Sequence, residues 1–277
     1  MTDALAAPTD RRRNGTPIQR ARARGLAAVS WLASRLPERA AVAVADAVGE
    51  AWYRLARGRA DQARRNLRRV AVELDRRDRG SKLARSAAHD PRSLERLVRL
   101  AFRHDARYYL EVLRAPSLTP AVFDQRVIVE TPEAVEATFA EGRPVIFVSG
   151  HLGPIELPAL YLAHRSGRRF VAPMETIDDP PLQAWFERTR GALGVRIVGL
   201  REARRELLAE LRAGGYVGIV GDRDVAGGGM PVELFGAPAP LPIGPALLAI
   251  ESGAAVAVVG VRRLQDGRIA GGLIPIP

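Results

Sequence analysis

The chain has 277 residues, of which 47% are hydrophobic, so it can bury a large core in one or two domains. It contains no cysteine, which excludes disulfide bonds and catalysis by a thiolate. Residues 1–120 hold 26 of the 42 Lys and Arg residues and 13 of the 31 Asp and Glu residues, a net charge of +13, whereas the remaining residues carry a net charge of −2. The basic character therefore belongs to the N-terminal part of the chain.

That basic part is not by itself evidence for nucleic-acid binding. Lys82 is the only lysine, a bias typical of codon usage in a GC-rich genome. A basic and partly amphipathic segment suits an anionic membrane surface as well as a nucleic acid. No uncharged apolar run approaches the roughly 18 residues of a membrane-spanning helix. We expect a peripheral protein on the cytoplasmic face of the cell membrane.

The first 120 residues show helical patterns behind a polar start. Residues 1–20 are arginine-rich and are expected to form a disordered basic tail. Trp31 and Trp52 fit a membrane interface or a protein core about equally well. A charged linker is expected near residues 75–91. Helices are expected over residues 26–57, with a break at Pro37, and over residues 62–70 and 94–114.

From Val127 onward, apolar strands alternate with helical patterns, which indicates an α/β fold with a twisted, mostly parallel central sheet flanked by helices. We expect one domain over residues 21–277, with a helical, membrane-associating part (21–120) and an α/β catalytic core (121–277). Strands are expected at residues 127–129, 145–149, 169–172, 195–198, 216–220, 232–235 and 255–261. Helices are expected at residues 132–140, 154–164, 180–193, 201–212 and 244–251.

His151 and Glu156 follow the buried strand at 145–149, at the kind of strand end where α/β sheets bind ligands. On one continuous helix, residues five apart lie on different faces. If Gly153 is the N-cap and Pro154 the first helical residue, however, Glu156 falls in the first turn and can reach back to the imidazole. A carboxylate on one ring nitrogen leaves the other free to take a proton. A surface histidine and a glutamate that caps the helix would have the same spacing.

A second polar group follows the strand at 216–220, where Asp222, Arg223 and Asp224 precede a glycine run. An aspartate there fits a turn or a helix cap as well as an active site. Arg223 suits a phosphate group, or an exposed ion pair with a neighbouring aspartate. The histidines lack the paired spacing of metal ligands, so no metal is expected. Ser149 lacks the Gly-x-Ser-x-Gly elbow of a serine hydrolase.

Four patches of sequence together resemble one family. They are Arg64–Leu67, Arg107–Glu111, Gly150–Glu156, and Gly221–Val225 followed by residues 233–239 and 242–246. These patches are similar to those of the bacterial lipid A biosynthesis acyltransferases and their relatives, the phosphatidylinositol mannoside acyltransferases, which are lysophospholipid acyltransferase-like enzymes. The stretch 222–225 looks closer to the mannoside branch.

The resemblance implies an acyl-CoA-dependent O-acyltransferase with a His-x4-Glu motif that acts on a glycolipid, with acyl-CoA as co-substrate and no bound cofactor. His151 would be the general base, Glu156 would orient it, and Asp222 would be a further catalytic residue. Gly153, Arg223 and Asp224 would contact substrate. The chain departs from the family in its longer, charged segment 75–93 and in its stop at residues 271–277, where the family continues through another strand and a helix.

We expect the acyl chain in an apolar groove beside His151, lined by the helices at 157–162 and 242–250. The amides near Gly153 or the guanidinium of Arg223 are candidate donors to the oxyanion. Two alternatives remain. One is an acceptor of the lipid A type. The other is a non-enzymatic, arginine-rich peripheral protein that binds nucleic acid or anionic lipid through residues 1–120, which explains the charge asymmetry but not the setting of His151 and Glu156.

Overall fold

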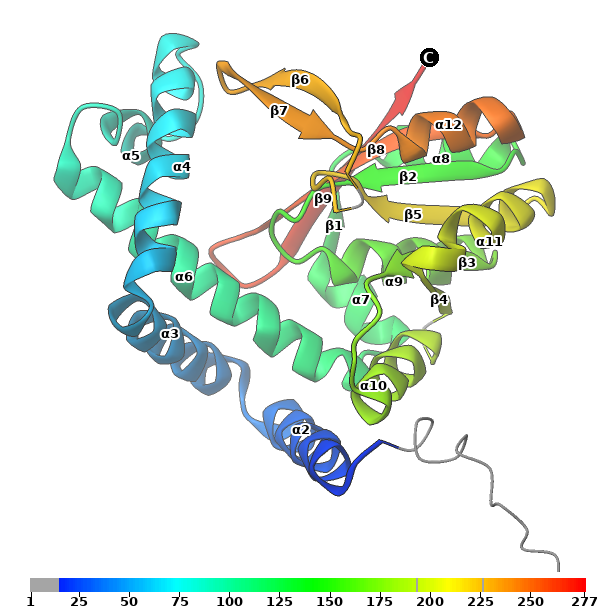
Figure 1. Cartoon of the computed structure of the whole chain (residues 1–277), viewed down its shortest axis with the longest axis horizontal. Coiled ribbons are helices and arrows are strands. Elements are labelled where there is room, and N and C mark those ends of the chain that lie inside the picture. Colours follow the sequence, from blue (N-terminus) through cyan, green and yellow to red (C-terminus); the bar gives the residue numbers. More distant parts are fainter. Residues whose placement is uncertain (1–14, 193, 226) are drawn as a thin grey trace, which may run out of the picture. The chain divides into compact units, whose positions relative to one another are not determined.

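The computed structural model describes residues 15–192, 194–225 and 227–277, apart from the side chains of Glu156 and Pro158 (Figure 1). Contacts divide these residues into two compact units. The sheet unit comprises the residues up to Arg35, Leu113–Gly221 and Gly244–Pro277, and the helical unit comprises Leu36–Val112 and Asp222–Ile243. The boundary expected near residue 120 thus falls inside the sheet unit.

The sheet unit confirms the expected α/β class, because it is built on one seven-stranded sheet in which the strands pair in parallel except β8 with β9. Strand β2 lies near the middle of the sheet, between β8 and β5, which makes it the best covered position for an apolar strand. In order across the sheet, the strands are β1 (Val127–Val129), β9 (Ile269–Ile276), β8 (Ala255–Arg263), β2 (Val145–Ser149), β5 (Tyr216–Val220), β3 (Phe170–Met174) and β4 (Val195–Gly199).

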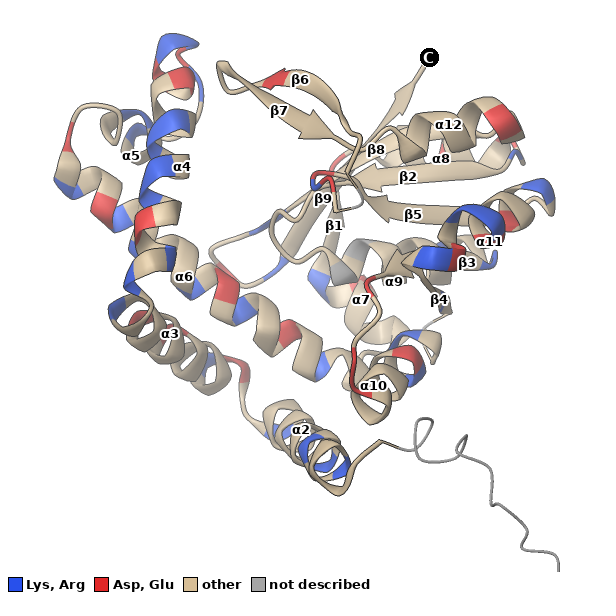
Figure 2. Cartoon of the chain, viewed as in Figure 1, with Lys and Arg blue, Asp and Glu red and all other residues tan. Residues whose placement is uncertain are grey.

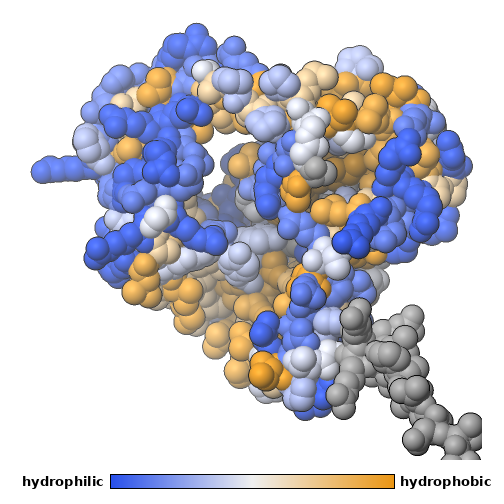
Figure 3. Space-filling model, in the orientation of Figure 1, coloured by the Kyte–Doolittle hydropathy of each residue, from blue (hydrophilic) through white to orange (hydrophobic). Residues whose placement is uncertain are grey.

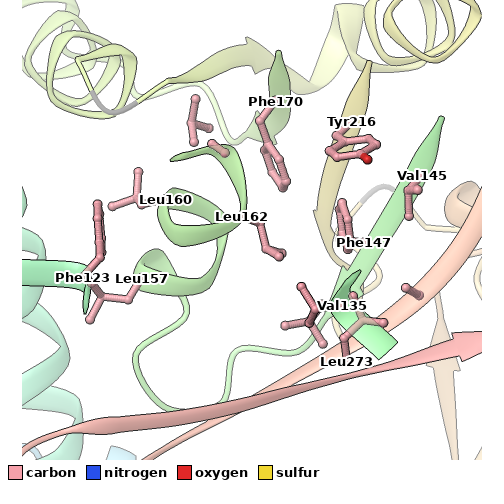
Figure 4. Packing of buried hydrophobic residues seen from close by; sticks show 14 of the residues in the cluster. Phe123, Val135, Val145, Phe147, Leu157, Leu160, Leu162, Phe170, Tyr216 and Leu273 are labelled. Atoms are coloured by element: carbon pink, nitrogen blue, oxygen red, sulfur yellow. The ribbon is translucent and has the colours of Figure 1, made fainter. Parts of the chain in front are cut away.

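Alternation along β2 sends its side chains into two cores, one on each face of the sheet. Val145 and Phe147 join the core under α7 (Pro120–Arg126), α8 (Pro132–Ala140) and α9 (Glu156–Ser166) (Figure 4). Ile146 joins the core under α11 (Leu200–Arg212) and α12 (Gly244–Ser252). Helices α9 and α12 therefore cover opposite faces.

Helix α2 (Pro17–Arg35) belongs to the sheet unit, where it packs against α10 (Pro180–Gly191). Arg22 pairs at 3.1 Å with Asp179, a buried residue whose carboxylate also accepts the amide of Leu182 and so caps α10. The last four residues of the expected disordered tail, 17–20, are helical because they form the first turn of α2, and residues 1–14 lie outside the described residues. Trp31 of α2 is exposed.

The helical unit contains α3 (Glu38–Leu55), α4 (Arg57–Arg76), α5 (Lys82–Ser86), most of α6 (Pro91–Arg114) and the hairpin of β6 (Met230–Leu234) and β7 (Ala237–Leu241). Val98 and Phe102 of α6 form its core, and Trp52 lies edge-on to Phe102 with ring centroids 5.5 Å apart. Trp52 is thus partly buried against this core, as its interpretation as a core aromatic residue expects. Its interpretation as a membrane anchor stays a prediction. The expected charged linker contains α5.

Arginine–carboxylate pairs join α6 to α3 and α4. Figure 2 shows acidic positions lying among basic positions along α4 and α6. Glu73 of α4 is buried beside Arg76 and Arg77, and their hydrogen bonds lower the pKa of its carboxyl group to about 2. The Oε2 atom of Glu73 lies 3.6 Å from the position that a Cβ atom on Gly236 would occupy. The tip of the hairpin therefore packs against α4. Phe235 and Gly236 both have positive φ, as a tight two-residue hairpin turn requires.

Like α5, the elements α7, β7 and β9 were not expected from the sequence. Strand β7 contains Pro238 and Pro240, and β9 contains two glycines and Pro275, all of which disfavour strands when judged locally. Pairing overrides this, because β9 is held by β8 on one side and by β1 on the other. Within the described residues, no helix is both long and apolar enough to cross a membrane.

Candidate active site

His151 lies just beyond the carboxyl end of the central strand β2, and its side chain is exposed. At this edge of the sheet the amide of Gly221 donates to the carbonyl oxygen of Ser149 at 2.8 Å, which ties the end of β5 to the end of β2. The strand is anchored by Ile146 and Phe147, which are almost fully buried. The His151 side chain is thus carried by a short loop that begins directly at a buried, rigid strand.

The loop from Gly150 to Ile155 is a series of tight turns. The amide of Leu152 donates to the carbonyl oxygen of Gly150 at 2.7 Å, and the amide of Ile155 donates to the carbonyl oxygen of Gly153 at 3.0 Å. Gly153 has φ +67°, and a Cβ on it would lie 3.0 Å from the carbonyl oxygen of Val261 in β8. Only glycine combines this backbone conformation with so close an approach to a neighbouring strand without strain.

The expected start of the helix needs correction. Helix α9 begins at Glu156 with Ile155 at its N-cap position, so Gly153 is not the N-cap and Pro154 is not the first helical residue. The reason is the left-handed backbone of Gly153, which is neither helical nor the extended conformation typical of an N-cap residue. Glu156 is still in the first turn, as expected. Its side chain lies outside the described residues, so its pairing with His151 stays a prediction.

An apolar pocket lies next to this loop, inside the sheet unit. It contains about 440 Å³ of empty space, including its open part. Val261, whose carbonyl abuts Gly153, lines it, and so does Leu157, the residue after Glu156. The remaining lining residues come from β1, α8, α9, β8 and β9: Val127, Val129, Val135, Tyr161, Leu162, Val259, Ile269, Gly271, Gly272 and Leu273.

The lining of this pocket differs from that expected for the acyl groove. Helix α9 lines it, as expected, but α12 does not, because α12 packs on the opposite face of the sheet through Leu248. The second wall is formed by the β1–β9–β8 edge of the sheet. Sequence analysis missed this wall because β9 was not recognised as a strand.

Asp222, Arg223 and Asp224 belong to the helical unit, whereas His151 and Gly153 belong to the sheet unit. Asp222 and Arg223 are exposed. The Oδ2 of Asp224 accepts the amide of Gly229 at 2.8 Å and so closes the loop that precedes β6. Asp224 thus has a structural role in its loop, and its contact with substrate stays a prediction.

Other polar residues considered from the sequence have contacts within their own part of the fold. The Ser149 hydroxyl donates to the carbonyl oxygen of Gly150 at 3.3 Å. His164 stacks on Phe123, and His89 lies 2.7 Å from a carboxylate oxygen of Asp75. In the described part of the chain, no three His, Asp or Glu side chains are grouped so as to hold a metal ion.

Comparison with known proteins gives consistent similarities. Residues 24–271 match the family model described as bacterial lipid A biosynthesis acyltransferase. The phosphatidylinositol mannoside acyltransferase of Mycobacterium tuberculosis (strain H37Rv) is 28% identical over 235 residues, which cover 83% of this chain and 69% of the relative. The enzyme of the same name from Mycolicibacterium smegmatis is 28% identical over 234 residues, covering 83% of this chain and 71% of the relative.

Proposed function

Because this chain belongs to the bacterial lipid A biosynthesis acyltransferase family, we propose that it transfers a long-chain acyl group from acyl-CoA to a hydroxyl of a phosphatidylinositol mannoside. The family supports an enzyme that acylates a lipid, and the named relatives support the acceptor. The observation that carries the proposal is the apolar pocket beside the His151 loop. An acyl chain suits it, because each buried methylene contributes about 0.8 kcal/mol.

In the proposed reaction, His151 takes the proton of the acceptor hydroxyl while the hydroxyl oxygen attacks the thioester carbonyl carbon. The tetrahedral intermediate collapses with cleavage of the carbon–sulfur bond, and the imidazolium returns the proton to the departing thiolate of coenzyme A. Glu156, in the first turn of α9, balances the charge of the imidazolium. The reaction needs neither a cofactor nor a covalent enzyme intermediate.

The oxyanion of this intermediate requires hydrogen-bond donors. The amides of Gly153 and Glu156, on either side of the turn that precedes α9, are candidates, since Pro154 has no N–H and the amide of Ile155 already donates to the carbonyl oxygen of Gly153. The guanidinium of Arg223 is a second candidate, for the oxyanion or for a phosphate of coenzyme A. Asp222 is proposed as a further catalytic carboxylate, and this role rests on the family motif alone.

We also propose that the enzyme works on the cytoplasmic face of the cell membrane as a peripheral protein. The net charge of +13 in residues 1–120 supports attraction to anionic lipids. Both substrates carry long acyl chains, so they partition into or near that surface.

The test is incubation of purified protein with labelled palmitoyl-CoA and candidate acceptors, followed by mass spectrometry of the lipids. Transfer to a phosphatidylinositol mannoside with release of coenzyme A supports the proposal. The description of the matching family favours a second acceptor, a lipid A precursor, which belongs in the same assay. Failure to acylate either lipid while vesicles or nucleic acid are bound would favour the non-enzymatic alternative.

A further inference from the structure

In helix α3 of the helical unit, two acidic side chains, Asp46 and Glu50, face inward, whereas Val44, Val48 and Leu55 face outward. Asp46 is bound through both of its oxygens by Arg107 of α6, at 2.6 Å each. Glu50 is 9% exposed and receives Arg99 of α6 at 2.6 Å. A surface helix of a globular protein usually buries its apolar stripe and exposes its charges. Helix α3 departs from this pattern, because Asp46 and Glu50 are turned inward while Val44 and Val48 are exposed.

Small residues on the inner face explain how α3 can pack this way. Ala41, Ala45 and Gly49 are buried, and a Cβ on Gly49 would lie 2.7 Å from the backbone of Phe102 and Arg103. The close contact with α6 thus requires small side chains. The larger apolar residues of α3 are left for the outer face.

The outer face of α3 is an apolar stripe about four turns long (Figure 3). Val44 is 56% exposed, Val48 is 55% exposed and Leu55 is 83% exposed. These residues recur at the spacing of one helix face. The exposed residues of α3 from Ala40 onward are Ala40, Ala43, Val44, Ala47, Val48, Ala51, Arg54 and Leu55.

We propose that this stripe, the exposed face of α3 between residues 40 and 55, is the surface through which the helical unit inserts into an anionic lipid bilayer. Charge complementarity selects this partner. Residues 54–59 contain three arginines and no acidic residue, so the most exposed leucine of the stripe stands among cations. Aliphatic side chains can enter the acyl boundary while guanidinium groups stay at the phosphates. The inference rests on the membrane association proposed above and names its contact surface.

The absence of cysteine allows a direct test in the full-length protein. Val48→Cys and Val72→Cys each provide a single site for an environment-sensitive dye. Val72 is the matched control, since it lies on α4 of the same unit and is 50% exposed. With vesicles of phosphatidylcholine and phosphatidylglycerol, dye emission should shift to the blue at position 48 and stay unchanged at position 72.

A second experiment measures binding itself. Val44→Ser combined with Val48→Ser should weaken co-sedimentation with these vesicles by about tenfold or more, because two aliphatic contacts with the bilayer are lost, whereas Val72→Ser should bind like the unaltered protein. With detergent-dispersed substrates, acyl transfer by the double variant should be unchanged. If the unaltered protein and all its variants fail to transfer an acyl group but the unaltered protein still binds vesicles, the proposed enzymatic activity is wrong. The proposed membrane-contact surface would still stand.

Two results would overturn this inference. Vesicle binding without a blue shift at position 48 would mean that the protein binds lipid through another surface. A dimer in light scattering that the double serine variant dissociates, with no vesicle binding, would make the stripe an interface between two copies of the chain.

Discussion

Gly153→Ala is the most specific test of the loop geometry, because a matched variant separates the strain of the backbone from the contact with β8. Gly153 and Gly167 lie just before and just after α9, with φ of +67° and +63°. Alanine at either position pays about 1–2 kcal/mol for the left-handed conformation. A new Cβ at Gly167 meets open space, whereas one at Gly153 lies 3.0 Å from the Val261 carbonyl oxygen.

The free energy of unfolding should therefore fall by a similar amount in both variants, and by somewhat more in Gly153→Ala. Their activities should differ. The tight contact must be relieved by a shift of a few tenths of an ångström, and the loop that carries His151 is the segment that can move. Since a misplacement of 1 Å can cost about 10²-fold in rate, we expect a loss of about tenfold in kcat for Gly153→Ala.

The assay combines urea unfolding with steady-state transfer from palmitoyl-CoA. Gly167→Ala should keep nearly the full rate at a reduced urea midpoint. If backbone strain alone mattered, the two variants would have similar kcat values. Values of kcat within about twofold of each other would therefore mean that the contact between Gly153 and Val261 does not position the loop that carries His151.

Further substitutions test the remaining parts of the site and the stability of the helical unit. His151→Ala should lower kcat by about 10²–10⁴ with an unchanged circular dichroism spectrum, and Glu156→Gln should be impaired less; turnover near the original value would refute either role. Val129→Phe narrows the pocket and should shift the preference toward shorter acyl chains, whereas Ala246→Phe, on α12 at the opposite face, should leave chain-length preference unchanged. The pKa of Glu73 is about 2 in the folded protein, below its usual value of 4.5. Its contribution to stability is therefore complete above pH 4.5 and is lost as the pH falls toward 2. Glu73→Gln should weaken this dependence of the thermal unfolding temperature on acid pH.

Local patterns in the sequence were sufficient for most of the regular elements. Strands β1, β2 and β5 have the expected bounds, because each is a short β-branched or aromatic run between polar turns. Helix α8 also matches its expected bounds, since Pro132 marks its start. The position of His151 after the central strand followed from the same local reading. The α/β class and the motif were therefore accessible from the sequence.

Tertiary structure decided the features that depend on long-range contacts. The pocket needs β9, whose glycines and proline form a strand only because β8 and β1 supply its hydrogen bonds. Helix α9 starts only at Glu156, after the left-handed Gly153, at which a Cβ atom would meet the carbonyl oxygen of Val261, more than a hundred residues away in sequence. The outward face of α3 depends on arginines of α6 that draw its carboxylates inward. Propensity and periodicity describe neighbours along the chain, so the partner that each face meets is set only when the chain has folded.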